Sequence, residues 1–332
     1  MEIPHHWAEL AAHLGEATGG SHSDLIKYVI PALLAGIGRT AKALSSKFHV
    51  SQAGSANVFG DDQLNVDVLA ERHFREELRG CLPVATASSE EDPVERQNLG
   101  PAGTYQTPEV PYTIAFDPLD GSSIIGPNWT VGSIIGVWEG ESALLQDPAS
   151  KQVAAVLGVY GPRTTAIIAV RVPGREDTAV CLEVGIKETD GSPEIIHSTL
   201  KFDEQPKARY FAPANLRAAS EDPNYMALIT HYINNRYTLR YSGGLVPDVV
   251  HALTKGHGIY ISPVASKSKA KLRRAYELCP IALIIECAGG RAIDPVDGSR
   301  ILDRPLEDLN ETAGLVCGTF EEVERVKSAL SS

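Results

Sequence analysis

The stretch Asp117-Pro118-Leu119-Asp120-Gly121-Ser122-Ser123 directly follows the apolar run Tyr112-Thr113-Ile114-Ala115-Phe116. The run predicts a buried strand, because its β-branched and aromatic residues end at turn residues. The strand would deliver Asp117 at its end, and Pro118 would fix the backbone before Asp120. Two carboxylates on such a tight turn can converge on a hard cation that prefers oxygen ligands. An ordinary β-turn is the alternative, because Asp-Pro-x-Asp-Gly contains good turn residues.

The residues around these two aspartates could add further oxygen ligands and phosphate donors. The carbonyl of Leu119 lies between them and could supply a neutral oxygen. Gly121 allows close approach of the backbone to a ligand, and its amide could bind phosphate oxygens together with the amides of Ser122 and Ser123. The turn would thus bring metal and phosphate together, as phosphoryl transfer requires.

Other acidic residues accompany this copy of the pattern. The strand-like run 84–87 leads into Glu90 and Glu91, so one acid could face a metal and the other a water, although a solvated acidic loop is the alternative. Asp61 and Asp67 flank the start of a predicted helix, where an ordinary N-cap is the alternative for Asp61. A second copy of the pattern at residues 294–298 lacks a long apolar strand before it. We predict a plain surface turn there.

Composition and charge narrow the class of protein. The chain has 332 residues, 43% hydrophobic and 22% charged, enough for one large domain or two that share an interface. Its net charge of -12 argues against a nucleic-acid partner, which would need a basic patch. No apolar run approaches the roughly 18 residues of a membrane span, and the N-terminal residues lack a targeting pattern. Five cysteines without a Cys-x-x-Cys pair indicate free thiols, so we expect a cytoplasmic protein without a membrane partner.

Hydrophobic periodicity predicts a mixed α/β chain. The expected helices cover residues 23–47 (divided or kinked at Pro31), 64–78, 222–235, 246–254, 280–288 and the segment after 319. The expected strands cover residues 83–87, 112–116, 131–138, 153–160, 164–172, 258–262 and 272–277. Segments 98–111 and 188–205 resemble linkers, and the second is a candidate junction between two halves.

Four motifs occur in a fixed order along the chain: Gly60-Asp61 with Asp67, Ser89-Glu90-Glu91, Phe116 through Ser123, and Lys271-Leu272-Arg273-Arg274-Ala275-Tyr276-Glu277. Together they resemble the class I fructose-1,6-bisphosphatase and sedoheptulose-1,7-bisphosphatase family. Four ordered motifs are far more specific than one turn. The resemblance implies the layered α/β/α/β/α sandwich of a sugar phosphatase.

Further stretches are similar to the sedoheptulose branch of that family, namely residues 158–165, 213–218 and 237–248. The fructose branch typically has a tyrosine that touches the distal phosphate where this chain has Ala218, and Ser262 replaces another tyrosine. Smaller residues would leave room for a seven-carbon bisphosphate. Residues 51–57 lack the cysteine pair that acts as a redox switch in plant plastid members, so the chain resembles a non-plastid member.

The resemblance also implies a role for each site residue. The metal ligands would be Glu90, Asp117, Asp120, Glu277 and the Leu119 carbonyl, holding two or three magnesium ions. Asp67 and Glu91 would orient or deprotonate the attacking water, and Asp61 would support a further metal. The amides of Gly121, Ser122 and Ser123 would stabilise the transferring phosphoryl group. The distal phosphate and sugar would contact Asn215, Arg240, Tyr241 and Lys271, for which solvated charges and a core aromatic are the alternatives.

The expected reaction is magnesium-dependent removal of the 1-phosphate of sedoheptulose 1,7-bisphosphate. Residues 1–200 would carry the metal and catalytic motifs and residues 201–332 the sugar and distal-phosphate site, in one compact unit. In the family the arginine that matches Arg240 comes from a neighbouring subunit, which implies a homodimer or homotetramer. A fructose-1,6-bisphosphatase or a dual-substrate enzyme is the alternative within the family. The complete carboxylate set argues against an inactive sugar-phosphate sensor, and the lack of Gly-x-Gly-x-x-Gly after a strand argues against a dinucleotide-dependent oxidoreductase.

Overall fold

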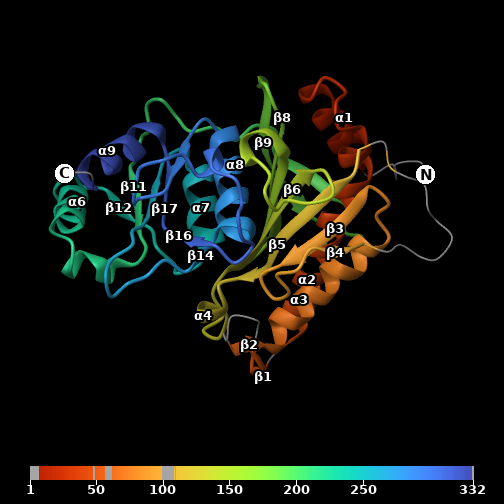
Figure 1. Cartoon of the computed structure of the whole chain (residues 1–332), viewed down its shortest axis with the longest axis horizontal. Coiled ribbons are helices and arrows are strands. Elements are labelled where there is room, and N and C mark those ends of the chain that lie inside the picture. The colour runs from red at the N-terminus through yellow and green to blue at the C-terminus, as the bar shows by residue number, and fades with distance from the viewer. Residues whose placement is uncertain (1–6, 48, 57–61, 99–107, 109, 331–332) are drawn as a thin grey trace.

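The computed structural model describes residues 7–47, 49–56, 62–98, 108 and 110–330. Within these residues, helices and sheets stack in five layers, in the order helix, sheet, helix, sheet, helix (Figure 1). Each sheet and helix has an apolar surface that a neighbouring layer must cover, and three clusters of buried side chains fill the spaces between layers. The α/β/α/β/α fold predicted from the resemblance is confirmed.

An eight-stranded sheet forms the second layer, with strand order β10-β9-β8-β7-β6-β5-β3-β4. The strands are β3 (Val84–Ser89), β4 (Arg96–Gln97), β5 (Tyr112–Asp120), β6 (Val131–Glu139), β7 (Gln152–Tyr160), β8 (Thr164–Val172), β9 (Arg175–Ile186) and β10 (Pro193–His197). Neighbours are antiparallel except β3 and β5, which are parallel. Strand β10 occupies part of the segment 188–205 that was interpreted as a linker, so that interpretation was too broad.

The outer face of this large sheet is covered by α1 (Ala8–Ala17), the π-helical turn η2 (Leu25–Val29), α2 (Ile30–Ser46) and α3 (Asn65–Arg79). Pro31 lies in the first turn of α2, directly after η2, and residues 23–46 are helical without a break, so Pro31 does not divide the segment and a π-helical turn precedes it instead. No helix among the described residues is both long and apolar enough to span a bilayer.

The central layer contains α7 (Leu245–Thr254), the π-helical turn η4 (Arg274–Leu278) and α8 (Cys279–Cys287). Helix α8 packs between the two sheets, and its residues are buried except the partly exposed Glu286. The predicted strand 272–277 was wrong beyond Arg273. Only β14 (Leu272–Arg273) is extended, and the following residues are buried on every side, so they carry no periodicity that separates helix from strand.

A second sheet, ordered β12-β11-β13-β17-β15, forms the fourth layer. Its strands are β11 (Tyr210–Pro213), β12 (Thr238–Leu239), β13 (Ile259–Ser262), β15 (Arg291–Ile293) and β17 (Leu315–Gly318). It is covered on the outside by α6 (Pro223–Asn234) and α9 (Phe320–Leu330). The smaller elements are β1 (Gln52–Ala56), β2 (Asp62–Leu64), α4 (Ser122–Ile125), α5 (Pro148–Lys151), η3 (Leu216–Ser220), η5 (Ile301–Asp303) and β16 (Thr312–Ala313).

Candidate active site

Parallel pairing of β3 with β5 brings the first two acidic motifs together. Ser89 pairs with Phe116, and the amide of Glu90 donates to the Phe116 carbonyl at 3.0 Å. Because the carboxyl ends of parallel strands meet at one edge of a sheet, Glu90 emerges beside Asp117. The charge of Glu90 acts on the Asp117 carboxyl. The predicted approach of these two acids is present in the structure.

The end of β5 carries Asp117 and Asp120, both almost fully buried at 6% and 9% exposure. The amide of Leu119 donates to Asp117 Oδ1 at 2.9 Å. Asp120 accepts from the first amides of α7, from Leu245 to Oδ1 at 3.2 Å and from Val246 to Oδ2 at 2.7 Å. The positive end of the α7 dipole thus faces this carboxylate. Sequence reasoning missed this contact because the partners lie more than a hundred residues apart.

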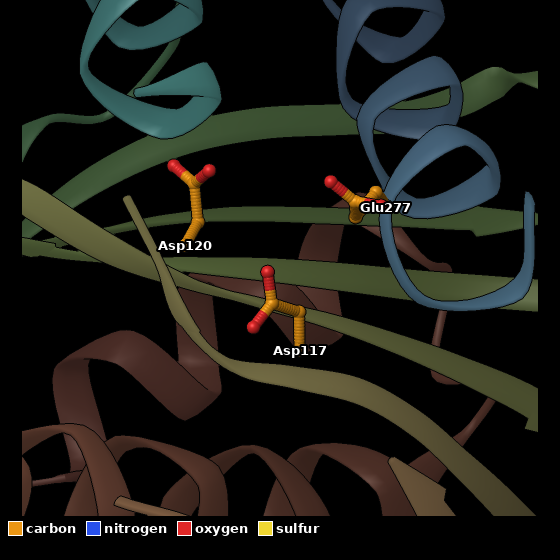
Figure 2. Close-up of side chains that lie close together, drawn as sticks. All are labelled: Asp117, Asp120 and Glu277. Carbon is orange, nitrogen blue, oxygen red and sulfur yellow. The ribbon is translucent and has the colours of Figure 1, made fainter. Parts of the chain in front are cut away.

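Glu277 reaches the same place from η4, on the opposite side of the site (Figure 2). Carboxylate oxygens of Asp117, Asp120 and Glu277 all lie within 4.8 Å of one another. Glu90 borders these three, and we call the four residues the acidic cluster. Arg273 joins two of its members, since its amide donates to Glu277 Oε2 and its Nη1 donates to Glu90 Oε1. Arg273 belongs to the last motif, but the sequence did not indicate this pairing.

Burial perturbs the acids of this cluster. Burial raises the pKa of Asp117 well above its usual range, and the charges of Glu90, Glu277 and Asp120 add to the effect. Burial and the charge of Glu90 likewise raise the pKa of Glu277. For Asp120, burial raises the pKa to about 6 although the two α7 amides oppose the shift. Buried carboxylates this close together are costly unless a cation compensates them, so the all-oxygen cluster fits a hard divalent ion.

Asp67 lies beside the cluster, in the first turn of α3. Its Oδ2 accepts from the Leu64 amide at 2.8 Å, and Ser122 Oγ donates to its Oδ1 at 3.5 Å. Burial raises the pKa of Asp67 to about 6, and the charge of Glu91 contributes in the same direction. Three separate elements therefore bring Asp67, Glu91 and Ser122 together. A carboxyl group with a pKa near neutrality suits a general base. Asp61 lies outside the described residues.

The turn after Asp120 is exposed, in contrast to the buried acidic cluster. Gly121 has φ of 103°, a left-handed conformation that favours glycine, and it precedes the short helix α4. A side chain at Gly121 would lie 3.0 Å from Val131 and 3.2 Å from Ile124. Ser122 and Ser123 are exposed at the start of α4, next to the cluster in the chain. Their amides are thus placed where a phosphate could reach them.

The residues predicted to hold the distal end of the substrate are more exposed than the acidic cluster. Arg240, Tyr241 and Lys271 are exposed, and Arg240 lies over the ring of Tyr210, 5.8 Å from its centre. Asn215 Nδ2 donates to the carbonyls of Pro263 at 2.7 Å and Ser268 at 3.4 Å, which stabilises the loop before Lys271.

The two proposed size determinants differ in position. Ala218 is fully buried among the side chains beneath α6 and does not border open space. The expectation that its small side chain leaves room for a longer sugar is therefore wrong. Ser262 is half-buried at the end of β13, so its side chain remains partly accessible, and its role stays a prediction.

Comparison with known proteins agrees with this geometry. The chain matches the family "Fructose-1-6-bisphosphatase, N-terminal domain" over residues 23–185 and "Fructose-1-6-bisphosphatase, C-terminal domain" over residues 204–331. It is 36% identical to the chloroplastic sedoheptulose-1,7-bisphosphatase of Triticum aestivum over 302 residues, which cover 90% of this chain and 72% of that protein. It is 33% identical to the class 1 fructose-1,6-bisphosphatase of Syntrophotalea carbinolica over 282 residues, which cover 84% and 81% of the two chains.

Solved structures show the same relationship. A Toxoplasma gondii crystal structure, provisionally assigned as a sedoheptulose-1,7 bisphosphatase, has a TM-score of 0.85 and 35% identity over 97% of this chain and 98% of the other. The fructose-1,6-bisphosphatase of Leishmania major in its holo form shares the fold, with a TM-score of 0.80 at 24% identity over 97% and 98% of the two chains. The chain therefore belongs to the fructose-1,6-bisphosphatase family, whose members are metal-dependent phosphatases that hydrolyse sugar bisphosphates.

Proposed function

We propose that this enzyme hydrolyses the 1-phosphate of sedoheptulose 1,7-bisphosphate with magnesium, giving sedoheptulose 7-phosphate and phosphate. The observation that carries the proposal is the buried acidic cluster, which lies in a chain 36% identical to a sedoheptulose-1,7-bisphosphatase. A fructose-1,6-bisphosphatase or a dual-substrate enzyme is the second candidate, because a bacterial class 1 enzyme of that kind is 33% identical over a similar length.

The acidic cluster and the Leu119 carbonyl would hold two or three magnesium ions. When bound, these ions would neutralise charge on the transferring phosphoryl group and activate a water for in-line attack. The chain itself supplies pre-oriented ligands, since Asp120 is fixed by two α7 amides and Glu277 by the Arg273 amide. Glu277 comes from the second half of the chain, so it would be an exception to the expectation that residues 1–200 carry the metal ligands.

Asp67 and Glu91 would orient and deprotonate the attacking water. Burial and the neighbouring charge that raise the pKa of Asp67 to about 6 would let it accept a proton near neutral pH. The amides of Gly121, Ser122 and Ser123 would stabilise charge that develops on the phosphoryl oxygens. Asp61 would support a further metal ion.

Arg240, Tyr241 and Lys271 would hold the distal phosphate and the sugar, with Asn215 acting through the loop it stabilises. Arg217 is exposed next to the buried Ala218, and its charge acts on the Tyr241 phenol. We include Arg217 as a donor to the distal phosphate, because its charge acts on Tyr241 and a guanidinium group can bind a phosphate through two hydrogen bonds.

A substrate panel tests the proposal. We expect kcat/KM with magnesium to be higher for sedoheptulose 1,7-bisphosphate than for fructose 1,6-bisphosphate. Arg217→Ala should raise KM for the seven-carbon substrate by about tenfold, the value of one charge-assisted hydrogen bond. A strong preference of the wild type for the six-carbon substrate would overturn the assigned substrate and leave the bisphosphatase activity standing.

We also propose a homodimer or homotetramer in the cytoplasm. The oligomer is supported by Arg240, because the matching arginine of the family comes from a neighbouring subunit. The cytoplasmic location is supported by the five cysteines, all of which are free and buried. Analytical ultracentrifugation would measure the assembly, and a monomer at micromolar concentration would contradict it.

A further inference from the structure

Strand β5 holds one extra residue between its two site aspartates. Asp117 pairs with Ile134 and Asp120 with Gly132, so three steps along β5 face two steps along β6. In a regular strand, residues three apart point to opposite faces. The extra residue forms a bulge that removes this alternation and allows Asp117 and Asp120 to face the same site. Convergence of the two carboxylates therefore depends on the bulge.

The carbonyl of Pro118, inside the bulge, accepts a hydrogen bond from a side chain of the neighbouring strand. Ser133 Oγ, from β6, donates to the Pro118 carbonyl oxygen at 2.6 Å. The hydroxyl of Tyr160, on β7, lies 2.6 Å from the same Ser133 oxygen. Ser133 is fully buried and Tyr160 is 8% exposed. Pro118 has no amide hydrogen of its own, so it cannot fix the bulge by donating.

The direction of these hydrogen bonds follows from the number of hydrogens. A serine hydroxyl carries one hydrogen, and Ser133 gives it to the carbonyl oxygen. The bond between Ser133 and Tyr160 must therefore take its hydrogen from Tyr160. The order of donation is Tyr160 to Ser133 to Pro118, and it runs across three neighbouring strands.

We propose that Ser133 and Tyr160 are positioning residues that preform the metal site. Their hydroxyl pair holds the Pro118 carbonyl and, with it, the bulge that directs Asp117 and Asp120 to one cation. The inference rests on the proposed role of those two aspartates as metal ligands. A slip of one residue in this strand would turn Asp120 away from the site, since neighbouring residues point to opposite faces.

The same strand offers a matched control at its other end. Thr113 Oγ1 donates to the Gly140 carbonyl at 2.9 Å and lies 2.8 Å from Thr86 Oγ1. Both threonines are buried. Thr86 Oγ1 in turn donates to the Glu141 carbonyl at 2.9 Å, so this pair, like Ser133, holds backbone carbonyls, but it lies at the start of β5. Thr113→Val removes a buried hydroxyl without touching the bulge.

The test measures binding of Mn²⁺ alone, by electron paramagnetic resonance of the free ion, together with Tm. We expect Ser133→Ala to weaken Mn²⁺ binding by about tenfold or more, as loss of a partner that orients ligands does. Tyr160→Phe should weaken it less, because Ser133 keeps its bond to Pro118. Ser133→Thr should restore binding, and Thr113→Val should lower Tm without changing Mn²⁺ affinity.

Equal Mn²⁺ affinity in Ser133→Ala and Thr113→Val would overturn the inference while leaving the proposed function intact. If Ser133→Ala does not fold, Tyr160→Phe decides, and unchanged Mn²⁺ affinity in that variant overturns the inference. A wild-type protein that binds no Mn²⁺ would instead remove the proposed metal site itself, and the inference with it.

Discussion

The pattern Asp-Pro-x-Asp-Gly occurs at residues 117–121 and at residues 294–298, and the two copies fold alike at short range. In each copy the Oδ1 atom of the first aspartate accepts the amide two residues later, at 2.9 Å. The glycine has a positive φ in both, 103° in the first and 69° in the second. The local turn therefore does not decide which copy is a functional site.

The second aspartate separates the two copies. Asp120 is bound by amides of α7 and lies among other acids, and burial raises its pKa to about 6. Asp297 is exposed and accepts the Ser299 amide at 2.8 Å, and hydrogen bonds from Ser299 lower its pKa. The first turn places its carboxylates among other buried acids, and the second is stabilised by hydrogen bonds within the turn. Partners distant in the chain make the difference.

The largest expected effect is on turnover. Asp120→Asn keeps the size of the side chain but removes one metal-ligand charge, so kcat/KM with magnesium should fall at least about 100-fold, beyond the loss typical of second-layer partners. Asp297→Asn is the matched control, and its kcat/KM should stay within about twofold, as for surface changes in general. Steady-state phosphate release measures both. Wild-type turnover in Asp120→Asn would refute its assignment as a ligand.

Glycine substitutions beside the first copy and within the second should differ in their effects: the first should lower both stability and activity, and the second stability alone. A Cβ at Gly132, which faces Asp120, would lie 2.4 Å from Val246 Cγ1 and 2.7 Å from the Gly158 carbonyl oxygen. Helix α7 must then shift, together with the amides that bind Asp120. Gly132→Ala should lower the free energy of unfolding by about 1–3 kcal/mol and reduce activity. Urea unfolding and kcat/KM measure the two effects.

The control is Gly298→Ala in the second copy, where φ is 69° and the nearest atoms belong to the flexible Lys327 side chain. It should cost about 1–2 kcal/mol of stability through backbone strain and leave kcat/KM unchanged. Loss of activity in this variant would show that the second turn also contributes to function.

These comparisons explain what could be read from the sequence. Strands β5 to β8 were predicted because each is a long apolar run bounded by turn residues, and the turn at 117–121 was placed correctly at a strand end. Convergence of Asp117 and Asp120 was expected from their spacing alone. Its physical reason is the bulge against β6, and the only local sign of that bulge in the sequence is Pro118, since proline inside a strand occurs at edges or bulges.

The parts that were missed depend on contacts between distant segments. The segment that carries Glu277 was predicted to be a strand, because burial on all sides hides helical periodicity. Parallel pairing of β3 with β5 and the contact of Asp120 with α7 follow only from the assembled layers. The small size of Ala218 was interpreted without knowing that its side chain is buried.

A smaller effect concerns pH. Burial raises the pKa of both Asp67 and Asp120 from 3.8 to about 6. A raised carboxyl pKa stabilises the metal-free fold below the unfolded pKa, and this stabilisation is lost as pH rises through about 6. Metal binding needs the deprotonated carboxylates, so stabilisation by Mg²⁺ should increase over the same range. At about 100 times the Kd, we expect Mg²⁺ to raise Tm by about 5 °C near neutral pH.

Scanning calorimetry with and without Mg²⁺ measures this effect from about pH 5 to about pH 7.5. Asp120→Asn should lose most of the Mg²⁺-dependent rise, and Asp297→Asn should keep it. A larger Mg²⁺ effect at the acidic end would contradict the assigned direction of the pKa shifts.

The smallest effect distinguishes the serines that follow the two glycines. Ser122 Oγ lies 3.5 Å from Asp67 Oδ1 and lowers the pKa of that carboxyl, although the bond is at the weak limit of distance. Ser122→Ala should raise the Asp67 pKa, so the acidic limb of kcat/KM against pH should move upward by about 0.3 pH unit. Ser299→Ala is the matched control and should leave the profile unchanged, because the hydrogen bonds of Ser299 are made to Asp297 and Asp294 of the second turn. A downward shift in Ser122→Ala, or an equal shift in both variants, would show that Asp67 does not set the acidic limb.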